Sequence, residues 1–415
     1  MVNYVFLSVY FYSVPNLRFP QFIEPWNNYI VSELLTTFPT NSLSWDQLAY
    51  DQDSSLKNLH YGLIHNGFQT TCIAGEDRLF PYINQSFIPL KHTLIQNGDL
   101  ILADASEDRK DVGRPVEMLD IGDQKIVSGL HTIHAKNKTN LIVNGFKGFY
   151  FQSSAMKQQI FKIANGSKIY GISSSAFNEL KMFIPEKQEQ KKIVDLMIKI
   201  EKKIQTQSKI IDDYMTYRNA IVDYFFESLS SDWNRIKLSN ILKEYSELHV
   251  KDNSIVHATL SKEGIFPKTD RYDRDFLVKD EDKKYKVTHL NDICYNPANL
   301  KFGVITRNTI GDCIISPIYV TFKIENGFLP KFVELLVTRK RFISRARKYE
   351  QGTVYERMAV NSSDLLSMYV SIPSLNTQQT IVNIINNIDN KISNEKELLK
   401  LYRAQKVYLL KNMFI

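Results

Sequence analysis

The chain has 415 residues, of which 43% are hydrophobic and 23% charged, so it can form two or three globular domains with ordinary cores. Its formal net charge of +7 favours a polyanionic partner and argues against a protein that mimics nucleic acid. Its three widely spaced cysteines, Cys72, Cys294 and Cys313, argue against a disulfide framework and a four-cysteine zinc site, and they fit a reducing cytoplasm.

Residues 1–13 form an apolar N-terminal extension. No Lys or Arg precedes the apolar run, and it is shorter than the roughly 20 residues of a membrane-spanning helix, so neither a signal peptide nor a membrane segment is expected. The first domain is predicted to begin at residue 14, with Val14-Pro15-Asn16-Leu17-Arg18-Phe19-Pro20.

Residues 14–183 read as a mixed α+β domain. Short apolar runs at residues 98–103, 125–133 and 168–172 are separated by Gly, Asn, Asp and Pro, which is typical of strands joined by turns. Residues 155–163 have a helical pattern. Strands and helices together predict the α+β class.

Residues 184–228 predict one long helix. From Ile193 onward, apolar residues recur at alternating steps of four and three, which is the heptad pattern of a coiled coil, interrupted only at Gln207 and Arg218. Pro185 precedes the run, where its missing N–H removes no intrahelical bond. At 1.5 Å per residue such a helix would be roughly 60 Å long.

Residues 229–371 predict a second α+β domain with the same order of elements. Trp26-Asn27 and Trp233-Asn234 open the two domains, and strand patterns recur at residues 291–296 and 313–320. The link to the preceding helix is very short, which is easily accommodated if the long helices run antiparallel.

Residues 372–415 repeat the long helix, since 184–226 matches 372–414 without a gap. The second heptad pattern is interrupted at the same two places, Glu395 and Lys406. All four interrupting residues are therefore candidates for fixing the register or contacting a partner.

Two matched heptad helices favour a coiled coil over separate core helices of an ordinary bundle. The predicted fold is α+β, with two similar domains, two long antiparallel coiled-coil helices and an internal pseudo-twofold duplication. The residues expected at the helix-helix interface are Ile193, Ile200, Ile204, Ile211, Tyr214, Ile221, Ile381, Ile388, Ile392, Leu399, Tyr402 and Leu409.

A search for catalytic or metal-binding patterns finds none. No glycine-rich loop has dinucleotide or P-loop spacing. Asn296-Pro297-Ala298-Asn299 only superficially resembles the Asn-Pro-Pro-aromatic motif of amino methyltransferases, and it reads as a turn that ends a strand. His131 and His134 lie three residues apart in a strand pattern, on opposite faces, so they are not expected to share a metal. The acidic residues between Asp104 and Asp111 alternate with cations and read as a solvated loop.

Basic residues point instead to phosphate contact. The segment 339–348 carries six cations and no acid, and a solvated helix face usually mixes both signs. An ordinary basic surface remains the alternative. The candidate phosphate contacts are Arg109, Lys110, Arg114, Lys136, Lys138, Lys301, Arg307, Arg339, Lys340, Arg341, Arg345, Arg347 and Lys348.

Five residues have side chains that can bond base edges, although each could equally be an ordinary strand or loop residue. These base-reading candidates are Tyr61, His65, Gln69, Tyr295 and Asn296.

The chain resembles the specificity subunits of type I restriction-modification systems. The resemblance covers nearly the whole chain after Val14, and it rests on weak motifs in a specific order within a duplicated frame. The motifs are Val14-Pro15-x-Leu17-Arg18-Phe19-Pro20, Tyr61-Gly62, Gly98-Asp99-Leu100-Ile101, Asp292-Ile293-Cys294-Tyr295-Asn296, Ser316-Pro317-x-Tyr319, and the Ile-Pro-x4-Gln-x2-Ile helix starts at residues 184 and 372. The apolar extension, and Lys191 where the other copy has Gln379, depart from the pattern.

The resemblance implies two target recognition domains, each reading one half of a split double-stranded DNA sequence, separated by helices that fix the spacing. It implies no catalysis by this chain and no cofactor bound to it. Two modification subunits would supply S-adenosylmethionine and methylate adenine, and restriction subunits would add ATP- and Mg-dependent translocation and cleavage, all in the cytoplasm. The competing functions are an enzyme, a coiled-coil scaffold, or a stand-alone DNA-binding protein.

Overall fold

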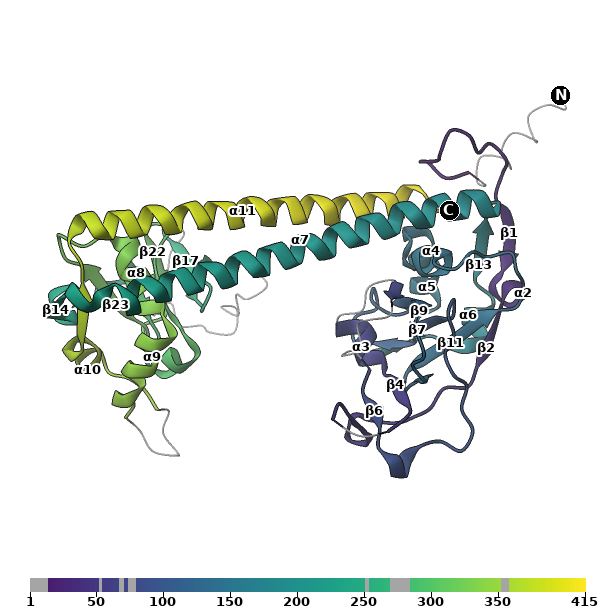
Figure 1. The fold of residues 1–415 in the computed structure, drawn as a ribbon, viewed down its shortest axis with the longest axis horizontal. Coiled ribbons are helices and arrows are strands. Elements are labelled where there is room, and N and C mark those ends of the chain that lie inside the picture. Colours follow the sequence, from purple (N-terminus) through teal and green to yellow (C-terminus); the bar gives the residue numbers. More distant parts are fainter. Residues whose placement is uncertain are drawn as a thin grey trace. The chain divides into compact units, whose positions relative to one another are not determined.

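The computed structural model describes residues 14–51, 54–66, 71–73, 80–250, 254–268, 284–351 and 358–415. It contains two compact units, which we call unit 1 (residues 1–209 and 396–415) and unit 2 (residues 210–395). Each of two long helices, α7 (Lys187–Ser228) and α11 (Leu375–Asn412), contributes residues to both units (Figure 1). The predicted long helices are confirmed, and the predicted extension 1–13 lies outside the described residues.

Unit 1 is an α+β domain. Its main sheet has the strand order β2-β11-β7-β9-β5, a second sheet has the order β10-β4-β6-β3, and two-stranded pairs join β1 to β13 and β12 to β8. Its elements before α7 are β1 (Asn27–Ile30), α2 (Val31–Leu34), β2 (Leu35–Phe38), η1 (Trp45–Gln47), β3 (Leu48–Ala49), β4 (Lys57–Leu59), α3 (Tyr61–Asn66), β5 (Thr71–Ile73), β6 (Tyr82–Ile83), η3 (Gln85–Phe87), β7 (Leu100–Ala103), β8 (Ala105–Ser106), β9 (Pro115–Asp120), β10 (Ile126–Ser128), β11 (Thr132–Asn137), α4 (Phe146–Gln152), α5 (Ser154–Ile163), β12 (Tyr170–Gly171), α6 (Ser174–Asn178) and β13 (Lys181–Ile184).

Unit 2 repeats the central part of this order. Its sheet β15-β23-β20-β21 corresponds to β2-β11-β7-β9, and the antiparallel pair β14-β24 corresponds to β1-β13. A second sheet has the order β16-β19-β22-β17-β18. Its elements between the long helices are η4 (Ser230–Asp232), β14 (Asn234–Lys237), η5 (Leu238–Asn240), β15 (Leu242–Tyr245), β16 (Leu248–Val250), β17 (Val256–Leu260), β18 (Ile265–Pro267), β19 (Lys284–Thr288), β20 (Ile293–Tyr295), η7 (Pro297–Phe302), β21 (Ile305–Arg307), β22 (Cys313–Ile315), β23 (Val320–Ile324), α8 (Pro330–Thr338), α9 (Lys340–Ala346), η8 (Arg347–Tyr349), α10 (Ser362–Ser367) and β24 (Tyr369–Ile372).

In each unit, α7 and α11 run antiparallel and are joined by an ion pair. In unit 1, Lys406 Nζ lies 2.7 Å from Glu201 Oε1, and in unit 2 Arg218 pairs with Asp389. Arg218 and Lys406 occupy equivalent positions of the sequence repeat, and so do Glu201 and Asp389. The same cross-helix ion pair therefore occurs once in each unit, with the donor on α11 in one and on α7 in the other.

The predicted heptad seam lies against the cores of the units. Ile193, Ile200 and Leu409 belong to the main core of unit 1, and Ile381 to that of unit 2. All twelve predicted interface residues are buried or half-buried. Gln207, an interruption of the seam, is also buried. Polar residues in the seam are thus part of the packed interface.

The glutamine of each Ile-Pro-x4-Gln-x2-Ile motif holds the start of its helix to a neighbouring loop. Gln190 is fully buried; its Nε2 donates to the carbonyl oxygens of Pro185 (2.8 Å) and Leu141 (2.9 Å), and its Oε1 accepts from the Val143 N–H (2.8 Å). Gln378 makes the equivalent bonds to Pro373 and Leu329 in unit 2. The bonds to Pro185 and Pro373 are buried and the others are part-buried, so the amide satisfies backbone groups that water reaches poorly.

Replacing Gln190 with Ala should therefore destabilise unit 1. The substitution leaves the buried Pro185 carbonyl without this partner and frees two part-buried groups that water can reach, so a loss of about 1–3 kcal/mol is expected. The shift of the urea unfolding midpoint measures it. Gln188→Ala, an exposed glutamine of the same helical turn, is the control. Equal midpoints for the two variants would contradict the assignment.

A buried aspartate at the start of the central strand also recurs in both units. In unit 1, Asp99 accepts from the backbone N–H of Gln96 (2.8 Å), and its Oδ2 lies 2.8 Å from His134 Nε2. Gly98 before it has a φ of 87°, so the chain makes a tight left-handed turn into β7. The Gly98-Asp99 motif is therefore a strand-entry turn with an anchoring carboxylate.

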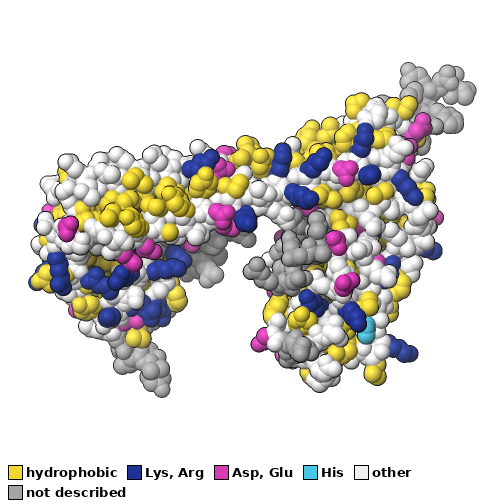
Figure 2. Space-filling model, viewed as in Figure 1, with side chains coloured by type: hydrophobic (Ala, Val, Ile, Leu, Met, Phe, Trp, Pro, Cys, Tyr) yellow, Lys and Arg dark blue, Asp and Glu magenta, His cyan; other side chains and the backbone are white. Residues whose placement is uncertain are grey.

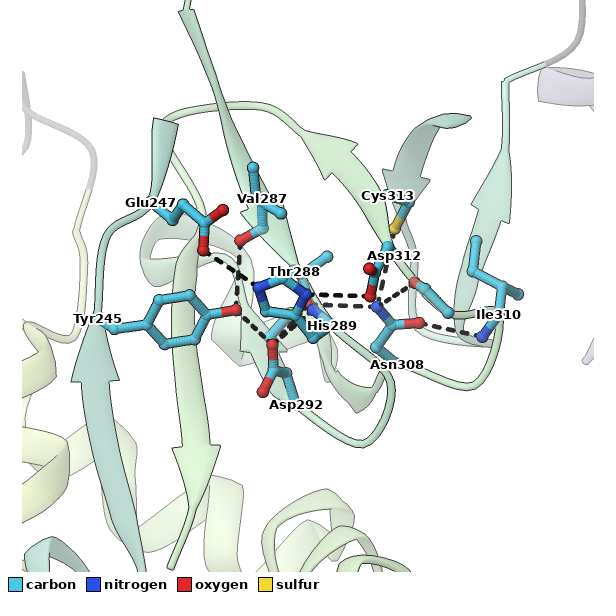
Figure 3. Close-up of polar contacts among 12 residues, drawn as sticks. Tyr245, Glu247, Val287, Thr288, His289, Asp292, Asn308, Ile310, Asp312 and Cys313 are labelled. Atoms are coloured by element: carbon cyan, nitrogen blue, oxygen red, sulfur yellow. Dashed lines mark hydrogen bonds and ion pairs between the residues drawn. The ribbon is translucent and has the colours of Figure 1, made fainter. Parts of the chain in front are cut away.

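In unit 2 the same turn is built with different donors. Asp292 accepts from the backbone N–H of His289 (2.6 Å), from the Tyr245 hydroxyl and from Thr288 Oγ1 (3.3 Å) (Figure 3). Tyr245 lies on β15, whereas His134 of unit 1 lies on β11, the partner of the equivalent strand. The aspartate accepts hydrogen bonds in both units. The aromatic side-chain donor comes from β11 in unit 1, but in unit 2 it comes from β15, which corresponds to the partner strand β2.

Candidate nucleic-acid interface

The basic segment 339–348 forms one face of α9 and its flanks. Phe342, Ile343 and Ala346 are buried in the core, which leaves the cations on the outer side of the helix. Figure 2 shows Lys and Arg gathered over the part of unit 2 that carries α8 and α9. Lys340 and Lys348 are exposed. A helix with one apolar face and one cationic face is therefore available to an anionic partner.

Three arginines of this segment line an open cavity of about 390 Å³. Arg341 pairs with Glu227 at 2.8 Å, and Arg345 Nη2 donates to the carbonyl of Tyr369 at 2.6 Å. Arg339 lies over the Phe226 ring at 3.9 Å, and burial lowers its pKa to about 10. Its Nε is buried without a hydrogen-bond partner among the described residues. Glu227 lines the cavity and Asp223 also acts on Arg339, so three guanidinium groups face two carboxylates and the balance still favours an anion.

The remaining cations of unit 2 differ in availability. Lys301 is exposed, with its Nζ 5.1 Å from the centre of the Phe302 ring. Arg307 is half-buried, donating to Glu334 Oε2 (3.1 Å) and Asn291 Oδ1 (2.7 Å). Arg347 pairs with Glu350 at 3.1 Å at the surface. The guanidinium of Arg307 therefore joins β21 to α8, and a phosphate contact by it stays a prediction.

In unit 1, most predicted phosphate contacts bond within the protein. Arg109 stacks on Phe161 with its Cζ 4.4 Å from the ring centre, and Arg114 donates to the carbonyl of His65 at 3.1 Å. Lys138 donates to the carbonyl of Ser32 at 3.2 Å. Lys110 is exposed.

Lys136 is tied into the protein more tightly. Its Nζ donates to Leu94 O at 2.9 Å and lies 3.3 Å from Asp99 Oδ2. The ammonium group thus adds positive charge to the anchoring carboxylate of β7. A phosphate contact by Lys136 stays a prediction.

The base-reading candidates differ in how far they are buried and in their hydrogen-bond partners. Tyr295 is fully buried with its hydroxyl bonded to the Val360 carbonyl (3.0 Å), and Asn296 is buried and accepts from the Ala298 N–H as the N-cap of η7. Tyr295 lies on β20, a central strand of its sheet, and Asn296 follows that strand as the cap of η7, so both side chains are engaged inside the protein. Tyr61 is half-buried at the start of α3. Gln69 lies outside the described residues.

His65 already uses both ring nitrogens. Nδ1 lies 2.7 Å from Asp111 Oδ2 and Nε2 lies 2.9 Å from the Ala105 carbonyl oxygen. The hydrogen bond to Asp111, above all, raises the pKa of His65. Asp111 is thus paired rather than part of a freely solvated loop, and His65 would have to break a bond to read a base.

From the sequence, His131 is only excluded from sharing a metal with His134. The structure places it at the turn before β11 with φ 53°, half-exposed, and with Nδ1 3.3 Å from Asp104 Oδ1. His134 is buried, so the two histidines do lie on opposite sides. In the sequence, the feature that could have marked His131 as a functional residue is its position at a turn just before a buried strand.

The described Cys, His and acidic side chains form neither a metal cluster nor an activated thiol. Among the described residues, no group of three or more His, Cys, Asp or Glu side chains is arranged to hold a metal ion. Burial raises the pKa of Cys294 to about 12 and that of Cys313 to about 11, so neither thiol is activated. His289 lies between Asp312 (3.0 Å) and Glu247 (3.1 Å), which raises its pKa (Figure 3). Within the part of the chain that is described, no helix is long and apolar enough to cross a bilayer.

Comparison with known proteins yields one family. The model of the type I restriction modification DNA specificity domain matches residues 82–213 and 282–401. A type I restriction-modification S subunit structure from M. genitalium is similar, with a TM-score of 0.53 and 13% identity over 97% of this chain and 99% of that one. A second structure, from a study of type I R-M complex assembly and conformational transition, has a TM-score of 0.59 and 12% identity over 94% and 98%. No curated protein matches in sequence.

Proposed function

Because the chain belongs to the family of type I restriction modification DNA specificity domains, we infer that it is the non-catalytic subunit that directs partner enzymes to a bipartite DNA target. The family match covers both halves of the duplication, and each half carries the same strand order around a buried aspartate. This repetition is the observation that carries the proposal. Two similar domains on one chain are suited to read two half-sites.

Affinity in this proposal comes mainly from phosphate contacts. Exposed cations such as Lys110, Lys301, Lys340 and Lys348, and the arginine-lined cavity of unit 2, would neutralise the DNA backbone. The half-buried Tyr61 remains a candidate for contact with base edges. Binding should therefore weaken steeply as salt concentration rises.

The long helices are the proposed docking surface for two modification subunits. In unit 2, Met215, Tyr217 and Tyr224 of α7 are exposed, and in unit 1, Leu401 and Tyr408 of α11 are exposed. Figure 2 shows hydrophobic side chains along these helices. Exposed apolar side chains of this kind on a helix support a partner interface. S-adenosylmethionine, ATP and Mg would bind to the modification and restriction subunits, in the cytoplasm.

Reconstitution with the modification subunit tests the proposal. Methylation of genomic DNA followed by long-read sequencing should reveal one sequence composed of two half-sites and a spacer of fixed length. The modification subunit alone is the control and should leave that sequence unmethylated. Methylation without a bipartite pattern, or failure to bind bipartite DNA, would favour the coiled-coil scaffold instead.

A further inference from the structure

The turn before β11 holds a histidine in an unusual backbone conformation. His131 has a φ of 53°, in the left-handed region that is uncommon for residues other than glycine, although Asn, Asp and His adopt it more often than the rest. Such strain persists only where the surrounding structure enforces it, and it is commonest at functional positions. The side chain is 50% exposed, so burial in the core does not explain the conformation.

Neighbouring groups hold the imidazole in place. Nδ1 lies 3.3 Å from Asp104 Oδ1, and the ring meets that of Tyr61 edge-on with centroids 5.2 Å apart. When Nδ1–H donates to the carboxylate, Nε2 of the neutral ring is an acceptor. Nε2 has no protein partner in the described part of the chain. An oriented, half-exposed acceptor is suited to bond an exocyclic amino group.

The duplication places an exposed side chain at the same point of unit 2. Ile133 on β11 pairs with Leu102 on β7, and Val320 on β23 pairs with Tyr295 on β20. Leu102 and Tyr295 each stand three residues after the anchoring aspartate of their unit. Counting back two residues from Ile133 and Val320 makes Ile318 the equivalent of His131. It is the unspecified residue of the Ser316-Pro317-x-Tyr319 motif.

Ile318 is 62% exposed, so its side chain is available for contact with another molecule. In a DNA major groove, an aliphatic side chain discriminates by contact with the methyl group of thymine, whereas an acceptor bonds the amino group of cytosine or adenine. The two equivalent positions thus carry the two kinds of chemistry that distinguish base pairs.

We propose that this turn position reads a base in each half-site. His131 accepts a hydrogen bond from the amino group of cytosine or adenine, and Ile318 packs against a thymine methyl. The inference rests on the proposed function. It adds specific residues to it, one on each unit, outside the candidates chosen from the sequence.

Single-base substitution of the target tests each contact. With the reconstituted methyltransferase complex, methylation rates are measured on the cognate duplex and on duplexes altered at each half-site position. His131→Gly removes the side chain at a φ that glycine adopts freely, and it should lower discrimination about tenfold or more at one position of one half-site. Ile318→Ala should do so at one position of the other half-site.

His92→Ala and Ile310→Ala, which alter exposed residues elsewhere in the same units, are the controls and should leave every ratio unchanged. His131→Asn, which tolerates a positive φ and keeps a polar amide, should retain a preference at the position that His131→Gly relaxes. Unchanged discrimination in both test variants would overturn the inference. A wild-type complex without a bipartite site would instead overturn the proposed function.

Discussion

Replacing residues 233–371 with the corresponding segment of a family member that reads another sequence is expected to change one half-site completely and leave the other unchanged. The segment closes on itself, because β14 pairs with β24 from Asn234 opposite Ile372 to Lys237 opposite Tyr369. Ile318, the proposed base-reading residue of unit 2, lies between these strands. Methylation sequencing of the reconstituted hybrid complex measures both half-sites at once.

The exchange succeeds only if the core around it is kept. Val222 and Phe226 of α7, and Ile381 and Ile385 of α11, pack into the same core as the exchanged segment. These residues should be retained and the donor chosen to match them. The reciprocal exchange of residues 26–184, bounded by the β1-β13 pair, should change the other half-site. Altered sequence in both halves after a single exchange would show that the domains do not read independently.

The periodic parts of this fold were predictable from the sequence. A heptad pattern places one residue in each turn on the same face, and Ile193 and Ile381 of that face are buried in the cores of unit 1 and unit 2. The partners of the polar interruptions were not predictable. Arg218 meets Asp389 rather than the repeat-related Lys406, because pairing depends on the register of antiparallel helices, which periodicity does not specify.

Individual contact residues were harder to predict. Tyr295 has a side chain suited to a base edge, but β20 lies between β21 and β23, where both faces are covered. Lys136 and Arg307 looked free because their acidic neighbours lie 37 and 27 residues away in sequence, at Asp99 and Glu334. A one-dimensional pattern cannot distinguish a cation held by such partners from one that faces solvent.

Lengthening both long helices together is expected to lengthen the spacer between the half-sites. Four residues inserted after Gln207 in α7 and four after Glu395 in α11 fall between the two cross-helix ion pairs. The same number of residues separates Glu201 from Arg218 as separates Asp389 from Lys406, so equal insertions preserve both pairs. Four residues add about 6 Å of helix, close to the rise of about two base pairs.

Four residues are chosen because of the rotation that they introduce. They advance an α-helix by roughly one turn and about 40° more, and a coiled coil absorbs such an insertion by local unwinding. Two base pairs rotate B-DNA by about 70°. The excess rotation of about 40° that the insertion adds to the helix therefore has the same sign as the rotation of the DNA and a similar size. We therefore expect unchanged half-sites and a spacer about two base pairs longer. Methylation sequencing of the reconstituted complex measures the spacer directly.

A control with an insertion in one helix only distinguishes an effect of helix length from an effect of disrupted helix pairing. Four residues inserted in α7 alone put the Arg218–Asp389 and Glu201–Lys406 pairs out of register with each other, so that variant should lose stability and methylation without a clean change of spacer. Recovery of activity with a longer spacer on adding the second insertion would show that the matched helices set the distance. A spacer of the original length in the doubly extended protein would mean that the helices do not determine it.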